Sequence, residues 1–209
     1  QAPHEASSFC LSLFSESGDK HTVWLPKKPD GFYRFSDDPE HSFLNVEAKD
    51  GKWLLCCNRP AFFQNVAPEL YQQIPVMNEQ LLNIECGDRT YTLITEQIPQ
   101  RGVMYTSYYL QSEIRITIGS LPSNDICCNS PFPARNHAVL TRENSTWHIE
   151  AVQAAYSVYV NNRKVDFCEL KLGDMVYIMG LRILIGSNFI SVSEMDGKVI
   201  ISPRIIKDM

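Results

Sequence analysis

The chain has 209 residues and a formal net charge of −5, with the apolar and charged fractions of an ordinary globular protein. Because Lys and Arg are outnumbered and scattered along the chain, the composition argues against nucleic acid as a partner. No apolar run reaches the ~20 residues that a membrane helix needs, so we expect no direct insertion into a bilayer.

The first half of the chain predicts a series of short β-strands. Apolar, aromatic and β-branched residues recur in short runs, and turns rich in Gly, Pro, Asp and Ser separate these runs. Residues 68–73 are expected to hold one helical turn. The predicted strands are residues 8–14, 22–25, 32–35, 43–47, 53–58, 81–88 and 90–94. This half therefore predicts a β-sandwich.

A joint between two domains is expected at residues 96–102, where Pro and Gly interrupt the strand pattern. The first domain is then a degenerate sandwich over residues 1–97, and the second is a sandwich over residues 103–202. Residues 203–209 are expected to begin a linker that leads to a membrane segment.

The second half of the chain also predicts short β-strands. It begins with the aromatic segment 104–110 and continues with residues 114–119, where apolar side chains occupy every second position. Gly119 is expected to permit a sharp turn after this strand. Further short strands follow at spacings of roughly eight to twelve residues, with Gly, Asn and Asp between them, which predicts a second β-sandwich.

The two halves repeat each other in outline. A strand from Leu44, a polar turn and Trp53 correspond to a strand from Ala138, a polar turn and Trp147. The hairpins around residues 87 and 180 correspond in the same way, and both offsets are about 93 to 94 residues. An equal offset at two separate places favours tandem copies of one fold. The alternative is that unrelated β-domains share such hairpins.

Five motifs in the second half occur in a characteristic order over about 80 residues. They are Ile118-Gly119-Ser120, Asn124-Asp125-Ile126, Arg135-Asn136-His137-Ala138, Val158-Tyr159-Val160-Asn161-Asn162, and Leu170-Lys171-Leu172-Gly173-Asp174 with Gly180. This order resembles a forkhead-associated (FHA) domain. The resemblance implies an all-β chain of two tandem FHA-like β-sandwiches, of which the first keeps none of the signature loop residues.

FHA domains are phosphothreonine readers, and the resemblance points to the positions that would hold the phosphate. The family's Arg position holds Ser120, its Ser position holds Ala134, and its Asn-Gly pair falls on Tyr156 and Ser157. Arg135 is retained among these degenerate positions. The resemblance thus predicts a fold that has lost phosphothreonine binding. The alternative is a functional phosphothreonine-binding signalling module.

Other family positions are expected to carry the architecture and not the ligand. In the family, the counterpart of His137 braces a loop from inside the fold. The structural positions that the resemblance implies are Gly119, His137, Asn161, Gly173 and Asp174.

The motif Ser202-Pro203-Arg204, directly after the second predicted domain, suggests a more particular family. The whole chain resembles the cytosolic N-terminal segment of the membrane-bound FtsK/SpoIIIE-type ATPase of type VII secretion, the EssC/YukB family of Gram-positive bacteria. There, two FHA-like domains precede a pair of membrane helices. The resemblance implies a non-catalytic scaffold at the cytoplasmic face of the cell membrane, which contacts other secretion subunits or neighbouring copies. The ATP-binding motors would lie beyond this segment.

No feature of the sequence predicts catalysis, a cofactor or a metal. The chain has no P-loop, no H-E-x-x-H motif and no G-x-S-x-G motif. The seven cysteines form no C-x-x-C pair and no zinc-spaced set with histidine, so buried free thiols in a reducing compartment are expected. No evident Cys or Ser nucleophile accompanies any of the five histidines, although the sequence leaves open a cluster in space.

Overall fold

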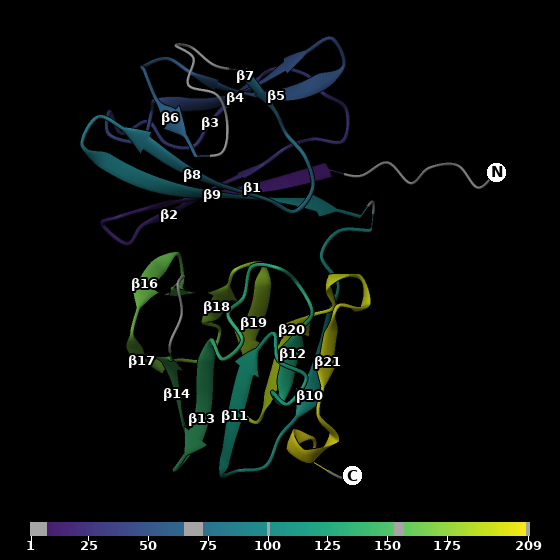
Figure 1. Cartoon of the computed structure of the whole chain (residues 1–209). Helices are drawn as coiled ribbons and strands as arrows, with labels where there is room; N and C mark the ends of the chain where they lie inside the picture. The colour runs from purple at the N-terminus through teal and green to yellow at the C-terminus, as the bar shows by residue number, and fades with distance from the viewer. Residues whose placement is uncertain (1–7, 65–72, 100, 153–156, 208–209) are drawn as a thin grey trace, which may run out of the picture. The chain divides into compact units, whose positions relative to one another are not determined.

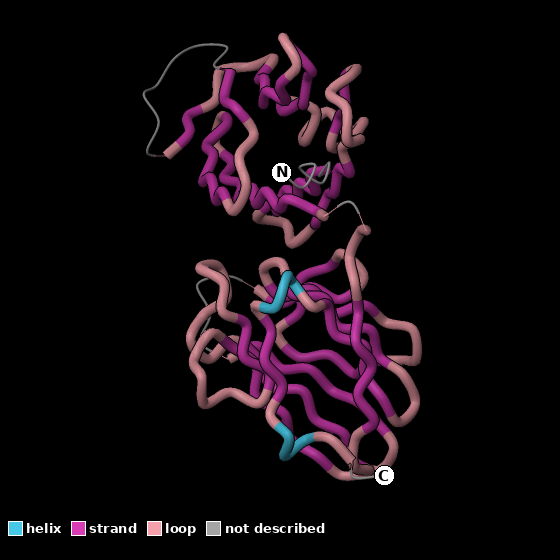
Figure 2. Tube along the Cα trace, turned by 90° about the vertical axis from the view of Figure 1, so that its right-hand side faces the viewer, coloured by secondary structure: helices cyan, strands magenta, loops and turns pink. Residues whose placement is uncertain are grey.

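The computed structural model describes residues 8–64, 73–99, 101–152 and 157–207. The chain forms two compact units, Gln1–Gly102 and Val103–Met209. Each unit contains two β-sheets (Figure 1), and strands dominate the trace of both (Figure 2). The predicted fold class, an all-β chain of two sandwiches, is therefore confirmed.

Among its described residues, nine strands build the first unit. Its larger sheet has the order β2 (Lys20–Trp24), β1 (Ser8–Ser15), β9 (Arg89–Ile98), β8 (Gln80–Cys86) and β6 (Phe62–Phe63). Its smaller sheet has the order β3 (Phe32–Arg34), β4 (Leu44–Lys49), β5 (Lys52–Cys57) and β7 (Gln73–Pro75).

One hydrophobic core lies between these two sheets. In β5 the buried positions are Trp53, Leu55 and Cys57, which alternate with more exposed ones, as expected for a strand with one face on a core. The larger sheet contributes Leu11 from β1 and Leu93 from β9, and both side chains are fully buried. Burying an aliphatic side chain of this size stabilises a fold by roughly 1.5–3 kcal/mol.

The last strand of the first unit extends into the expected joint. β9 continues to Ile98, which pairs with Ser8 of β1, so residues 96–98 belong to a strand. This happens because Ile98 is buried against the sandwich and its backbone has a partner strand. The helical turn expected at residues 68–73 lies outside the described residues, apart from Gln73, which opens β7.

In the part of the second unit that the structure describes, there are twelve strands. Its first sheet has the order β10 (Tyr105–Tyr109), β20 (Phe189–Ser193), β19 (Leu181–Ile185), β18 (Met175–Ile178), β15 (Val158–Val160) and β16 (Arg163–Val165). Its second sheet has the order β17 (Phe167–Leu170), β14 (Thr146–Ala151), β13 (Ala138–Glu143), β11 (Ile114–Gly119), β12 (Ile126–Cys128) and β21 (Val199–Ile201).

Alternation along β11 explains why the second sandwich forms. Ile114, Ile116 and Ile118 are buried while Arg115 is exposed, which is the period-two pattern of a strand on a core. Trp147, at the start of β14, is 2% exposed and donates its indole N–H to the Gly186 carbonyl (3.0 Å). The hydrogen bond removes the cost of burying the indole N–H in the core.

The repeated hairpins have the same register in both units. Ala48 of β4 faces Trp53 of β5, and Arg142 of β13 faces Trp147 of β14. In each hairpin the two facing residues are five positions apart in the sequence. The two residues of the turn between the strands both have positive φ angles. The tandem repeat inferred from the equal sequence offsets corresponds to an equal strand pairing.

The C-terminal segment folds back onto the second unit. The short 3-10 turn η2 (Pro203–Ile205) carries Ile205, which is fully buried in the core. Figure 2 shows η2 in cyan, as it does the earlier 3-10 turn η1 (Met195–Gly197). Leu110 and Ile206 form a β-bridge. Residues 203–207 therefore pack against the second unit, whereas the sequence predicts that a linker begins at residue 203.

An ion pair holds this segment in place. Arg204 donates from Nε to Oδ1 of Asp125 (3.0 Å) and from Nη2 to Oδ2 (2.6 Å). Nη2 also donates to the Arg115 carbonyl (2.8 Å), and Asp125 accepts a hydrogen bond from the Thr117 backbone N–H (2.9 Å). We call the pair of Asp125 and Arg204 the C-terminal clasp. Two-point binding of this kind fixes orientation as well as adding energy.

None of the helices formed by the described residues has the length and apolar character that crossing a bilayer requires.

Candidate functional site at the loop end of the second unit

Three loops of the second unit meet at one end of its second sheet. Ile118 pairs with Ala138, and Ala138 pairs with Ala151, so the loops that follow β11, precede β13 and follow β14 are neighbours. We call residues 120–125, 129–137, 152 and 157 the loop site. Tyr156, which belongs to the third loop, lies outside the described residues.

Gly119 allows two of these loops to approach each other. A Cβ atom at this position would lie 2.2 Å from the Arg135 carbonyl oxygen and 2.8 Å from Nδ2 of Asn124. Gly119 is absent from the glycines with positive φ, and β11 runs through it to pair with Cys127 of β12. β11 ends at Gly119 and the chain bends from Ser120 onwards, but the glycine is needed here for close packing of the two loops and not for a φ that only glycine adopts readily.

Asn124 ties the first loop to the second. Its side-chain amide donates to the carbonyls of Arg135 (2.7 Å) and Leu121 (3.1 Å). The Ser120 backbone N–H donates to the Ala134 carbonyl (3.0 Å), which adds a main-chain contact between the same loops. Asn124 is buried, and the sequence assigned it no role beyond its motif. The feature of the sequence that could have pointed to Asn124 is a polar residue two positions before the fully apolar strand β12.

His137 braces the second and third loops from inside. The side chain is fully buried, Nδ1 accepts a hydrogen bond from the Ala134 N–H (2.9 Å), and Nε2 lies 3.3 Å from the Ser157 carbonyl. Because Nδ1 is the acceptor, Nε2 carries the proton and donates to that carbonyl. The geometry thus supports the architectural role that the family resemblance implies for this histidine.

Gly119→Ala is expected to lower the stability of the second unit by about 3 kcal/mol, because the backbone carbonyl of Arg135 must move to admit the methyl group. This change is measured by urea denaturation with amide hydrogen exchange of β11 and β13 as the readout, because these strands report on the second unit alone. Ser120→Ala is the matched control, since the Ser120 side chain is half-buried and its loss removes no described contact. Equal urea concentrations at the midpoint of unfolding for the two variants would contradict the packing role of Gly119.

The loop positions that hold the phosphate in the family carry different side chains here. Ala134 carries no hydroxyl group, and Ser120 replaces the cation of the family pattern. Arg135 is exposed and forms no ion pair with any described residue. It is the one cationic residue between Ser120 and His137 in the sequence. A dianion would therefore meet one exposed guanidinium in place of a set of converging donors.

Asn161, Gly173 and Asp174 lie away from the loop site. Asn161 follows β15, whereas the loop site precedes it. Its amide donates to Oδ1 of Asp174 (2.9 Å), and its Oδ1 accepts from the Met175 N–H (3.0 Å). Oδ2 of Asp174 accepts from the Lys171 N–H (2.8 Å), while Gly173 takes a φ of +89° in the same turn. These residues close two turns, which supports their expected structural role.

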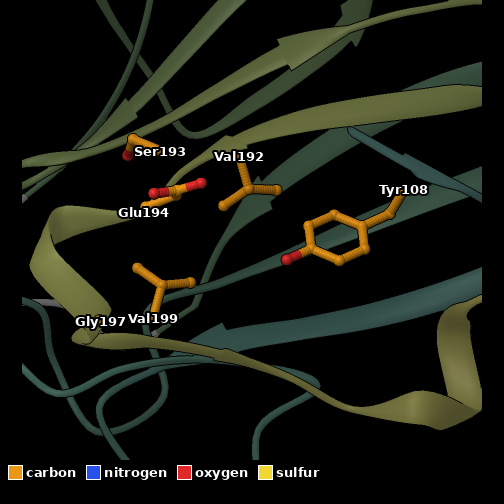
Figure 3. Close-up of a pocket in the computed structure, with 6 residues that line it drawn as sticks. All are labelled: Tyr108, Val192, Ser193, Glu194, Gly197 and Val199. Carbon is orange, nitrogen blue, oxygen red and sulfur yellow. The ribbon is translucent and has the colours of Figure 1, made fainter. Parts of the chain in front are cut away.

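A small pocket of about 170 Å³ lies elsewhere in the second unit (Figure 3). Its lining comes from β10, β20, β21 and η1 and includes Tyr108 and Glu194. Glu194 accepts a hydrogen bond from Thr106 (2.8 Å). The pocket is smaller than sites that hold organic ligands, which measure about 300–1,000 Å³, and its charged residue repels anions. It does not substitute for a phosphate cradle.

Residues 116–179, which lie in the second unit, match the family model of the FHA domain. Domains of this family mediate protein interactions and are non-catalytic. No curated protein matches the chain.

The whole chain is similar in fold to the N-terminal FHA domain from EssC, a component of the bacterial type VII secretion apparatus. The similarity covers 97% of this chain and 98% of that chain, with a TM-score of 0.61 and 15% sequence identity. The FHA-2 domain from the Mycobacterium tuberculosis ABC transporter Rv1747 matches over 37% of this chain and 72% of its own, with a TM-score of 0.34 and 24% identity.

Proposed function

We propose that this chain is a non-catalytic interaction region of a membrane-bound type VII secretion ATPase of the FtsK/SpoIIIE type. The observation that carries the proposal is the correspondence of fold with the EssC region over nearly the full length of both chains. A single FHA domain is common to many functions, whereas two sandwiches in this order are a more particular arrangement. The region would act at the cytoplasmic face of the cell membrane.

The loop site favours a scaffold over a phosphothreonine reader. Ser120 and Ala134 replace the cationic and hydroxyl groups of the family pattern, and Arg135 alone supplies positive charge there. The interactions between loops come from Asn124 and His137, which bond to main-chain groups and need no ligand. The loops are therefore held in place while the phosphate contacts of the family are missing.

Exposed aromatic residues offer contacts that do not depend on phosphate. Phe62 is 44% exposed, Tyr109 is 50% exposed and Phe167 is 64% exposed. β10, which carries Tyr105 and Tyr109, is the edge strand of its sheet. Aromatic side chains beside an edge strand are suited to protein partners, which here would be other secretion subunits or neighbouring copies of the ATPase.

Affinity purification of the tagged full-length protein, with and without residues 1–207, tests the proposal. We expect that the deletion removes specific secretion subunits or self-association from the purified material. Arg135→Ala is the matched variant for the alternative function, since it removes the exposed cation of the loop site and leaves the fold intact. Loss of partners on Arg135→Ala or on phosphatase treatment would favour a phosphothreonine module, and an unchanged partner set on deletion would contradict the scaffold role.

A further inference from the structure

Metal-ligating side chains converge in the first unit, far from the loop site in sequence. One potential ligand atom from each of Asp19, His21 and His41 lies within 4.8 Å of the other two. The same holds for Asp38, Glu40 and His41. The rings of His21 and His41 have centroids 4.5 Å apart. Two sets of three potential ligands therefore meet at His41.

His41 gives an independent indication of a ligand. The residue is only 3% exposed, and its Nε2 has no hydrogen-bond partner among the described residues. Nε2 of His21 is likewise buried without such a partner. Buried polar atoms in native proteins are almost always paired, because leaving one unpaired costs roughly 1–3 kcal/mol. An ion between the two imidazoles would satisfy both.

The carboxylate of Asp38 orients the ring of His41. Its Oδ2 lies 3.3 Å from Nδ1 of His41, and its Oδ1 accepts a hydrogen bond from the Glu40 N–H (3.0 Å). A carboxylate beside one imidazole nitrogen is the usual support for a histidine that binds metal through its other nitrogen. Nε2 of His41 is thus the nitrogen available to a metal ion.

The loop that carries His41 is anchored from outside the cluster. Nη2 of Arg59 donates to the Pro39 carbonyl (3.0 Å), and the Tyr91 hydroxyl donates to the Glu40 carbonyl (3.1 Å). The Glu40 side chain is paired with Arg89. Because Glu40 is already engaged, the remaining ligands for an ion are Asp19 and the two histidines.

The chemistry of these groups suits zinc. Two imidazoles and a carboxylate are a typical ligand set for Zn²⁺, whereas Ca²⁺ and Mg²⁺ prefer oxygen ligands alone. Zinc bonds of about 2.0–2.2 Å require the ligand atoms to close by about an ångström.

We propose that Asp19, His21 and His41 bind Zn²⁺ in the first unit, with Asp38 as the positioning residue and a fourth position open to water. The ion ties the turn between β1 and β2 to the loop before β4. The sequence predicted no metal because His21 and His41 are twenty positions apart on different elements, and only the fold brings them together. This inference is independent of the proposed secretion role.

Titration of the chelator-treated full chain with Zn²⁺, followed by calorimetry and thermal unfolding, tests the site. We expect one equivalent of zinc to bind with submicromolar affinity and to raise the unfolding temperature of the first unit. His21→Asn and His41→Asn are each expected to weaken binding at least about 100-fold, and Asp38→Asn about 10–100-fold. His148→Asn, which removes a histidine of the second unit, is the matched control and is expected to leave binding unchanged.

Loading the protein with Co²⁺ in place of Zn²⁺ distinguishes binding at this site from binding at the free cysteines. We expect the visible bands of four-coordinate cobalt without a thiolate charge-transfer band, since the ligands carry nitrogen and oxygen only. A thiolate band would overturn the proposal. So would full affinity in both histidine variants, or zinc binding no tighter than millimolar in the native chain. Since His21 is half-buried, its variant keeps the test valid even where His41→Asn impairs folding.

Discussion

A chain shortened to end at Ser202 is expected to lose about 5 kcal/mol of stability in its second unit. The truncation removes Ile205, a fully buried core side chain worth about 2–5 kcal/mol, and Arg204, whose hydrogen bonds to the Asp125 carboxylate add roughly 1.5–3 kcal/mol. Whole domains are stable by only about 5–15 kcal/mol, so the second unit becomes marginal. Hydrogen exchange of β11 and β12 by mass spectrometry measures the loss.

A chain ending at Lys207 is the control, because it keeps the clasp and the buried isoleucine. Equal exchange rates for the chains ending at residues 202 and 207 would show that the segment is dispensable, as a linker would be. The comparison therefore decides between the packed segment of the structure and the domain limit that the sequence suggests.

Acid titration isolates the contribution of the clasp. Burial acts to raise the pKa of Asp125, but hydrogen bonds from Arg204 and Thr117 outweigh it, so the pKa lies below its usual value. The clasp then stabilises the folded state above the unfolded pKa of about 3.9, and this stability is lost as the pH falls through the lower folded pKa. In Arg204→Ala we expect a lower plateau near pH 7 and a shallower loss on acidification.

Phosphothreonine peptides are expected to bind the native chain no more tightly than millimolar. The family cradle lacks its Arg and Ser groups at Ser120 and Ala134, and each hydrogen bond to a charged group is worth roughly 1.5–3 kcal/mol. Two or three missing contacts amount to about 5 kcal/mol, which weakens a micromolar reader at least a thousandfold. Fluorescence anisotropy with a threonine-phosphorylated peptide library measures the affinity.

The double variant Ser120→Arg and Ala134→Ser tests the reason for this loss. We expect it to restore phosphate-dependent binding by at least about tenfold, since both groups return to loops that Asn124 and His137 already hold. The unphosphorylated peptides are the control. Micromolar, phosphate-dependent binding by the native chain would instead establish the alternative function.

Local patterns in the sequence predicted much of the fold. The alternation of Ile114, Ile116 and Ile118 gives the buried face of β11 because side chains of a strand point to opposite faces in turn. The equal spacing of Trp53 and Trp147 within their hairpins predicted the tandem repeat, and the register of both hairpins is the same. Such signals arise within one or two neighbouring strands.

Contacts between distant segments could not be predicted in the same way. Gly119 is required because the Arg135 carbonyl lies against it, and Asp125 is held by Arg204 from the other end of the unit. His21 and His41 approach each other only after both sheets have formed. Each contact depends on the register of whole sheets, whereas the sequence pattern reports only the faces of individual strands.

The brace formed by Asn124 and His137 has an evolutionary consequence. Both side chains bond to main-chain groups of the loops, so the shape of the loops does not depend on which side chains stand at positions 120, 134 and 135. Recognition and folding are thereby uncoupled at this end of the domain. Replacements at positions 120, 134 and 135 are therefore expected to change the surface that the loops present and to leave their backbone in place.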